Sequence, residues 1–138
     1  DIHFIDPFEV PDDWYRAAGF DYGNDNRSQI LRKRPNSDER FFTNEWTYYK
    51  GSVSSRIKDY WAWKEKLGLI HKRYKVWCDT NMHARSSELP DEKTPLEKMK
   101  AYFQERNSNN QISFTPVTKK PMNGNRKKSP EKRNKKGR

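Results

Sequence analysis

The stretch A-A-G-F-D-Y-G, residues 17–23, joins small and aromatic residues to a single carboxylate, Asp21. The apolar run indicates a short buried strand, and Gly23 with the turn-forming Asn-Asp-Asn after it indicates where the strand ends. A second stretch, V-W-C-D-T-N at 76–81, repeats the arrangement with Asp79. The sequence therefore predicts two buried strands that each end in an aspartate.

The remaining elements follow from residue periodicity and turn signals. Runs rich in aromatic and Thr residues, and runs of alternating polarity, predict the strands. The five predicted strands cover 17–22, 27–34, 40–50, 74–79 and 111–117. Apolar residues at a 3.6-residue period predict a helix from Val53 to Leu67, with Ser52 as its N-cap and Gly68 as its stop. The capping-box sequence Thr-Pro-Leu-Glu at 94–97 opens a second helix.

These elements predict an α/β fold with a mixed sheet, built from a three-stranded meander, a helix, a parallel strand, a second helix and a last strand. A chain of 138 residues has the size of one domain, and its 14% aromatic content supplies the core. The single cysteine, Cys78, excludes an intramolecular disulfide and a multi-cysteine zinc site. No apolar run reaches the ~20 residues of a membrane span, so we expect no membrane partner.

Most of the positive charge lies at the C-terminus. The formal net charge is +10, and residues 119–138 hold ten Lys or Arg against Glu131, which gives +9 and leaves +1 for the rest. We expect a flexible, disordered basic tail that binds DNA phosphates by counterion release, or, alternatively, a solvated tail without a specific partner. The candidate DNA-binding residues in the tail are Arg126, Lys127, Lys128, Lys132 and Arg133.

Asp21 and Asp79 form the candidate catalytic pair. Their strands are separated by a hairpin and a helix, and strands so connected can lie side by side in parallel. Neighbouring strands are ~4.8 Å apart, so the two carboxylates could share Mg²⁺ or Mn²⁺. Two such ions ~4 Å apart would stabilise the attacking and leaving oxygens of a phosphodiester displacement. The alternative for each aspartate alone is a turn residue or a helix cap.

Three stretches carry a resemblance to a known family. F-E-V-P-D-D-W-Y-R-A-A-G-F-D-Y-G, residues 8–23, resembles the lead-in and first strand of the C-terminal nuclease domain of phage terminase large subunits. F-F-T-N-E-W-T-Y-Y-K-G, residues 41–51, resembles the third strand of that family, and V-W-C-D-T-N resembles the strand with its second catalytic aspartate. The resemblance implies an RNase H-like metal-dependent endonuclease that cuts double-stranded DNA during genome packaging. It assigns Asp21 and Asp79 to the first and second metal-binding acids, with two Mg²⁺ or Mn²⁺ ions.

The same resemblance implies a domain plan and a set of partners. Residues 1–16 would be the lead-in from a missing N-terminal motor domain, 17–118 the nuclease domain, itself incomplete, and 119–138 the basic tail. No Walker A motif is present, and 119–138 hold only Glu131 where the family places its third metal-binding acid downstream. The implied partners are double-stranded DNA, the portal protein and the small terminase subunit, in the host cell cytoplasm.

Further candidates and functions stay open. Glu45 is a candidate catalytic residue that could bind a metal ion or contact a residue that does. Alternatively, it is a solvent-facing residue of its strand. His83 and Asp25 lie four residues after Asp79 and Asp21 and could assist. Two other functions fit the same residues: an RNase H-like transposase or resolvase, or a noncatalytic nucleic-acid-binding module that uses the basic tail.

Overall fold

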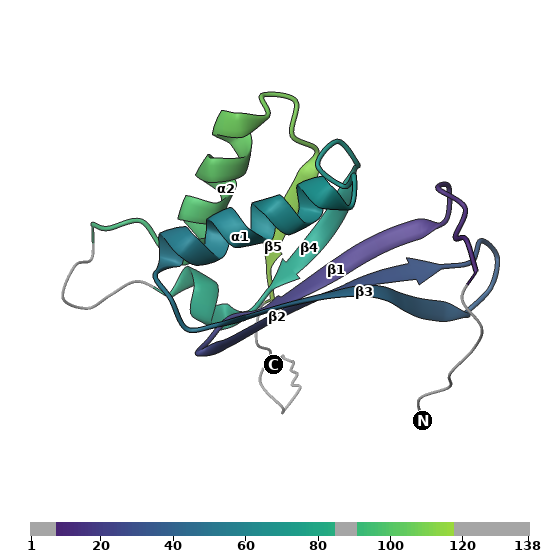
Figure 1. Ribbon diagram of the computed structural model, residues 1–138, viewed down its shortest axis with the longest axis horizontal. Helices are drawn as coiled ribbons and strands as arrows, with labels where there is room; N and C mark the ends of the chain where they lie inside the picture. The colour runs from purple at the N-terminus through teal and green to yellow at the C-terminus, as the bar shows by residue number, and fades with distance from the viewer. Residues whose placement is uncertain (1–7, 85–90, 118–138) are drawn as a thin grey trace, which may run out of the picture.

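The computed structural model of the protein describes residues 8–84 and 91–117 (Figure 1). The strands in these ranges are β1 (Tyr15–Asp21), β2 (Asp25–Lys33), β3 (Arg40–Tyr49), β4 (Tyr74–Cys78) and β5 (Ile112–Pro116). The helices are α1 (Val53–Lys66), α2 (Pro95–Arg106) and a short 3₁₀ helix, η1 (Thr80–His83). The predicted order of elements is confirmed, and η1 is added to it.

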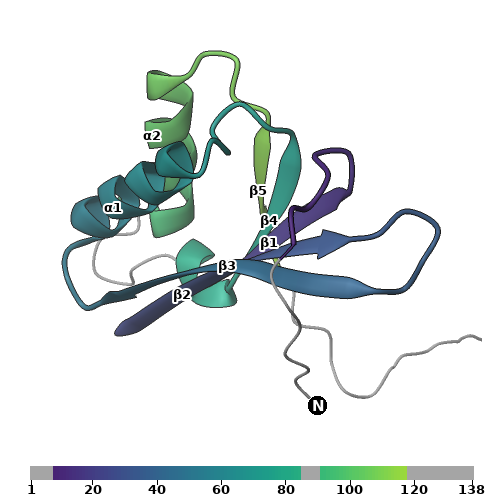
Figure 2. The same cartoon turned by 45° about the vertical axis from the view of Figure 1, so that its right-hand side comes forward.

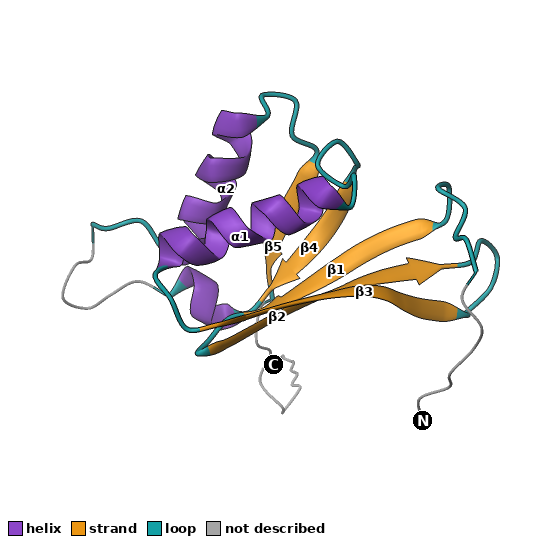
Figure 3. Ribbon diagram, viewed as in Figure 1, coloured by secondary structure: helices purple, strands orange, loops and turns teal. Residues whose placement is uncertain are grey.

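The five strands form one mixed sheet in the order β3-β2-β1-β4-β5 (Figure 3). β1, β2 and β3 form an antiparallel meander, whereas β4 pairs parallel to β1 and β5 parallel to β4. α1 makes the crossover from the edge strand β3 to β4, and α2 makes the crossover from β4 to β5. The crossover through α1 therefore places the end of β4 beside the end of β1.

Both long helices lie on the same side of the sheet (Figures 1 and 2). β4 shows the resulting alternation, because Tyr74, Val76 and Cys78 are buried whereas Lys75 and Trp77 are exposed. No helix in the described ranges covers the other side, which we call the open face. Along β1 and β4 the open face carries Tyr15, Gly19, Asp21, Lys75 and Trp77.

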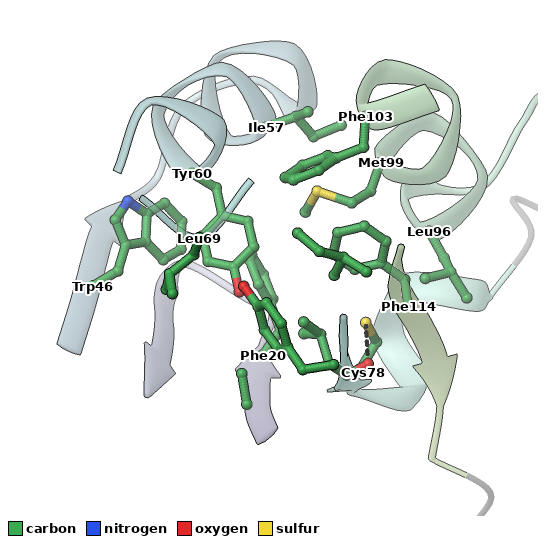
Figure 4. Close-up of a cluster of buried hydrophobic side chains, with 14 of the residues drawn as sticks. Phe20, Trp46, Ile57, Tyr60, Leu69, Cys78, Leu96, Met99, Phe103 and Phe114 are labelled. Carbon is green, nitrogen blue, oxygen red and sulfur yellow. Dashed lines mark hydrogen bonds between the residues drawn. The ribbon is translucent and has the colours of Figure 1, made fainter. Parts of the chain in front are cut away.

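Aromatic side chains join the helices to the sheet (Figure 4). The Phe103 ring of α2 lies 4.9 Å from the ring of Trp61 on α1 and 4.8 Å from the ring of Phe114 on β5. The Tyr60 ring of α1 lies 4.7 Å from the ring of Phe20 on β1. Phe103 and Tyr60 are fully buried. A protein with few aliphatic residues thus builds its core from edge-to-face ring pairs.

Local signals fix where the helices begin. The Ser52 hydroxyl accepts a hydrogen bond from the Ser55 amide of α1 at 3.1 Å. Gly51 before it has φ +87°, and a side chain there would meet Tyr48 at 2.8 Å. In α2 the Thr94 hydroxyl and the Glu97 carboxylate form the predicted capping box. Both predicted N-caps are confirmed.

The predicted turn after β1 is wrong in its length. The strand ends at Asp21, and β2 already begins at Asp25, so Asp25 and Asn26 are strand residues. The buried Asn26 side chain closes the turn, since its Oδ1 accepts from the Gly23 amide at 3.3 Å and its Nδ2 donates to the Tyr48 carbonyl at 2.9 Å. The Asn26 side-chain amide therefore closes a turn that is shorter than the sequence pattern predicted.

The segment before β1 is tied to the sheet. One guanidinium nitrogen of Arg32 on β2 donates to the carbonyls of Pro11, Asp12 and Trp14 at 2.8, 3.3 and 3.3 Å. The Asp12 carboxylate also pairs with Lys72, in the loop before β4, at 3.0 Å. β1 itself begins at Tyr15, two residues earlier than predicted, so the predicted boundary between residues 16 and 17 falls inside a strand.

Some predictions fall outside the described residues. The basic tail with its five candidate DNA-binding residues belongs to 118–138, and the first seven residues of the lead-in are also outside. Within the described ranges, none of the helices has the length and apolar character needed to cross a membrane.

Candidate functional site

Parallel pairing of β1 and β4 brings Asp21 and Asp79 together. Phe20 lies opposite Cys78 in the parallel register, and the Asp79 amide donates to the Phe20 carbonyl at 3.0 Å. Asp21 is the last residue of β1, and Asp79 directly follows β4 as the N-cap of η1. The two aspartates thus leave adjacent strand ends at the same level, as predicted from their positions in the sequence.

The two carboxyl groups contact each other and differ in proton affinity. A hydrogen bond between them raises the pKa of Asp21, and burial and the negative charge of Asp79 raise it further. For Asp79, burial raises the pKa, but hydrogen bonds from the Asn81 amide, the Asp21 carboxyl, the Tyr22 amide and the Thr80 hydroxyl outweigh it and lower the pKa. The pair therefore takes up its first proton more readily than an isolated aspartate does. Two carboxylates this close repel each other when both are ionised, so a bound cation would stabilise the doubly ionised form.

A trough of about 780 Å³ runs along the open face from this pair. Ala17 and Gly19 of β1 form its floor, between residues of β2 and β4. Gln29 and Trp77 lie opposite Gly19 on the two sides, and Leu31 lies opposite Ala17. We call this surface the open-face trough. Its residues include Tyr15, Ala17, Gly19, Asp21, Leu31, Lys33, Arg40, Phe42, Trp77 and Asp79.

The chemistry of the pair fits a divalent cation with oxygen ligands. Mg²⁺ is commonly held by one or two protein carboxylates and completes its shell with water and substrate phosphate. Asp21 and Asp79 supply two such oxygen donors at the end of an open trough. Among residues 8–84 and 91–117, no group of three or more His, Cys, Asp or Glu side chains could hold a metal ion. The pair could therefore hold a cation only together with water, substrate or residues outside those ranges.

Glu45 lies on the open face but is not grouped with the pair. It stands opposite Gln29 on β3, two strands away from β1. Its carboxylate forms an ion pair with the Arg27 guanidinium at 3.3 Å. Arg27 lies directly opposite Asp21 and stabilises the ionised form of that aspartate, so the structure places a cation between Glu45 and the pair.

The other candidates occupy different surroundings. His83 is the last residue of η1, and its buried Nε2 finds no hydrogen-bond partner among the described residues. Asp25 is an exposed residue of β2. Cys78 is fully buried on the helix-covered side, where burial raises the pKa of its thiol to about 12. Cys78 therefore packs in the hydrophobic core.

Sequence reasoning missed the trough itself. Trp77 and Gly19 lie on the same face as the two aspartates because side chains alternate along a strand. Trp77 and Gly19 lie two residues before Asp79 and Asp21. The two-residue period of a strand could therefore have predicted that they share a face with the aspartates. The bulge on β3 and the pairing of Phe42 with Leu31 depend on strand register, which the sequence pattern did not predict.

The strand order, the parallel β1–β4 pair and the helical crossover define a mixed α/β fold of the RNase H-like class. Among solved structures, the chain is similar to the nuclease domain of the P22 large terminase, with a TM-score of 0.50 and 15% sequence identity. The match covers 83% of this chain and 50% of that chain, so this chain spans about half the length of that structure. The likeness confirms the predicted fold class.

A second structure is less similar. The Aquifex aeolicus Ppx/GppA phosphatase matches with a TM-score of 0.40 and 11% identity, over 74% of this chain and 36% of that one. No family model matches the chain, and no curated protein matches it in sequence.

Proposed function

We propose that the protein is a metal-dependent DNA endonuclease domain of the terminase large-subunit type. The observation that carries the proposal is the contact between the Asp21 and Asp79 carboxyl groups at adjacent parallel strand ends. The fold similarity to the P22 large terminase nuclease domain supports the same reading. The open-face trough gives a polymeric substrate access to the pair.

Each residue of the site has a role in phosphodiester hydrolysis. Bound Mg²⁺ or Mn²⁺, two ions in the proposal, would supply Lewis-acid stabilisation of the attacking and leaving oxygens. Asp21 and Asp79 would hold the cations and fix their position against the scissile phosphate. Hydrogen bonds from the Asn81 amide and the Thr80 hydroxyl, at 3.1 and 3.3 Å, orient the Asp79 carboxylate. Arg27 presents a guanidinium beside Asp21 that can bind a neighbouring phosphate.

The proposed setting is viral genome packaging. There, the domain would cut double-stranded DNA in the host cell cytoplasm, in an assembly with a portal protein and a small terminase subunit. The basic tail at 119–138 would add sequence-independent phosphate contacts through Arg126, Lys127, Lys128, Lys132 and Arg133. Glu45 is proposed as a residue that positions Arg27 through their ion pair.

Plasmid cleavage tests the proposal. The full chain should nick and linearise supercoiled plasmid DNA in Mn²⁺ or Mg²⁺, and Asp21→Asn or Asp79→Asn should lower the rate at least about 100-fold, since each removes a charged ligand. Asp38→Asn, at an exposed turn, is the matched control and should cleave normally. Calorimetric titration with Mn²⁺ should show binding to the control and a large loss in both site variants.

Three results would contradict the proposal. Full cleavage by both site variants would exclude the pair from catalysis. Cleavage restricted to branched or junction DNA, in a panel that includes linear duplex, would instead favour a resolvase or transposase of the same fold. Binding of DNA without cleavage under any metal condition would favour the noncatalytic module.

A further inference from the structure

We propose that the open-face trough binds one unpaired strand of nucleic acid beside the carboxylate pair. This inference rests on the proposed function for the position of the cut. The strand-binding surface itself is argued from the shape, the aromatic side chains and the charge of the trough.

The trough follows β1 and is lined by its neighbours on both sides. Its floor is formed by Ala17 and Gly19 of β1, and the lining continues to Trp77 of β4 on one side and through β2 to Phe42 of β3 on the other. Since neighbouring strands are ~4.8 Å apart, β2 and β4 stand ~10 Å apart across β1. Gly19 adds to the depth, because nothing lies within 4 Å of where its Cβ would be.

Exposed aromatic rings line the trough. Tyr15, Phe42 and Trp77 are 55%, 69% and 42% exposed, although rings of this size are normally buried in a core. They come from three different strands and line the same trough. Aromatic rings bind single-stranded nucleic acid by stacking on its bases, which are unavailable inside a duplex.

Cations lie where a strand would leave the pair. Lys33 stands opposite both Tyr15 and Arg40, at the end of the trough away from Asp21. The ammonium of Lys75, on β4, lies 4.9 Å from the centre of the Trp77 ring. The open face thus carries both aromatic rings and cations, the combination that holds bases and phosphates in single-strand-binding proteins.

Charge also decides against two other occupants. The segment 119–138 carries +9 and would be repelled by Lys33, Arg40 and Lys75. A second copy of the chain, placed symmetrically on the same face, would bring these cations against one another. A polyanion with exposed bases satisfies both the rings and the cations.

Binding measurements on the full chain test the inference. Fluorescence polarisation in EDTA, without cleavage, compares a labelled oligo-dT strand with a labelled duplex of the same length. Trp77→Ala and the double variant Lys33→Gln/Arg40→Gln should each weaken oligo-dT binding about fivefold or more and change duplex binding by less than about twofold. Trp77→Phe, which keeps a ring, should retain most of the affinity.

Matched controls separate the trough from general electrostatics. Lys58→Gln/Arg106→Gln removes two cations from the helices and should leave the preference for oligo-dT unchanged. Equal weakening of oligo-dT and duplex by the trough variants would overturn the inference, as would unchanged oligo-dT binding. Competition by polyglutamate as strong as that by oligo-dT would also overturn it, because it would show a surface for any polyanion.

The outcome is independent of the cleavage test. Asp21→Asn/Asp79→Asn should bind oligo-dT at least as tightly as the unaltered chain in EDTA, since it removes two negative charges from one end of the trough. If that variant and the unaltered chain both fail to cleave while Trp77→Ala weakens strand binding, the proposed nuclease function is wrong and the strand-binding surface stands. If cleavage requires the pair but Trp77→Ala binds oligo-dT normally, the surface is wrong.

Discussion

The two aspartates of the site respond differently to protons, and this difference governs how the site would take up a cation. The pKa of Asp21 is raised mainly by its hydrogen bond to Asp79, so ionising Asp21 is unfavourable in the folded, metal-free protein. Because the folded pKa lies above the unfolded value of 3.8, the contribution of Asp21 to stability falls as the pH rises through the raised pKa. At a pH above the raised pKa, the closeness of the two carboxylates lowers the stability of the folded protein, as residues placed for function often do.

Asp21→Asn should therefore stabilise the metal-free protein at pH 7 and abolish its stabilisation by metal. Thermal unfolding with and without Mn²⁺ measures both effects. In the unaltered chain, the rise in melting temperature with Mn²⁺ should shrink as the pH is lowered through the raised pKa of Asp21, because protons compete with the cation. A variant that is less stable without metal, or that still gains stability from Mn²⁺, would contradict this account.

Lys64 is a second residue whose charge is set by its surroundings. Its side chain is fully buried in α1, its ammonium donates to the Tyr74 hydroxyl, and the rings of Tyr60 and Trp63 lie within 6 Å of it. Burial lowers the pKa of Lys64 to about 7 from an ordinary 10.5. Between these values the unfolded chain binds a proton that the folded chain does not, so stability rises with pH.

Lys64→Met/Tyr74→Phe should remove that pH dependence, since it deletes both polar partners together and leaves neither unsatisfied. Chemical unfolding at pH 7 and pH 9 measures it. The unaltered chain should gain up to about 1.4 kcal/mol per pH unit from Lys64 in this window relative to the double variant. Parallel pH profiles for the two proteins would show that Lys64 is charged in the folded state.

At the scale of elements, α2 depends on its cap. It follows the undescribed stretch 85–90, and its first turn is held by the reciprocal hydrogen bonds of Thr94 and Glu97 at 3.2 and 2.8 Å. The buried face of the helix, with Leu96, Met99 and Phe103, packs against the core only if the helix starts at the right residue. The cap therefore fixes the register of a whole crossover.

Thr94→Ala should lower the free energy of unfolding by about 1 kcal/mol, the usual cost of removing an N-cap hydroxyl. Urea unfolding followed by far-ultraviolet circular dichroism measures it. Ser54→Ala, an exposed position within the first turn of α1, is the control and should change stability by less than about 0.5 kcal/mol. Equal effects of the two substitutions would show that the cap contributes nothing specific.

Features that adjacent residues determine were predictable from the sequence. Features that depend on contacts between distant residues were not. The caps at Ser52 and Thr94 and the stop after α1 at Gly68, with φ +73°, are read from a few adjacent residues. The early start of β2 depends on Asn26 reaching the Tyr48 carbonyl, 22 residues away. No pattern within a single stretch contains that contact.

At the scale of the whole molecule, some features were likewise predictable from the sequence and others were not. The meeting of Asp21 and Asp79 follows from the strand order, which their connections favour, and was predictable. Lys64 is not among the apolar residues that mark the buried face of α1 in the sequence. In the structure, aromatic rings from α1 and β4 nevertheless enclose its side chain. The trough depends on the register of β1 against both of its neighbours, so it emerges only in the assembled sheet.

The anchoring of the segment before β1 has a mechanical consequence. Arg32 bonds three carbonyls of that segment, and Lys72 bonds the Asp12 carboxylate from the loop before β4. A pull applied ahead of residue 11 would be shared between β2 and that loop before it reached Tyr15. Asp21 lies at the opposite end of β1 from these contacts. The force would therefore act on the end of the sheet away from the site, and the distance between the two carboxylates would be kept.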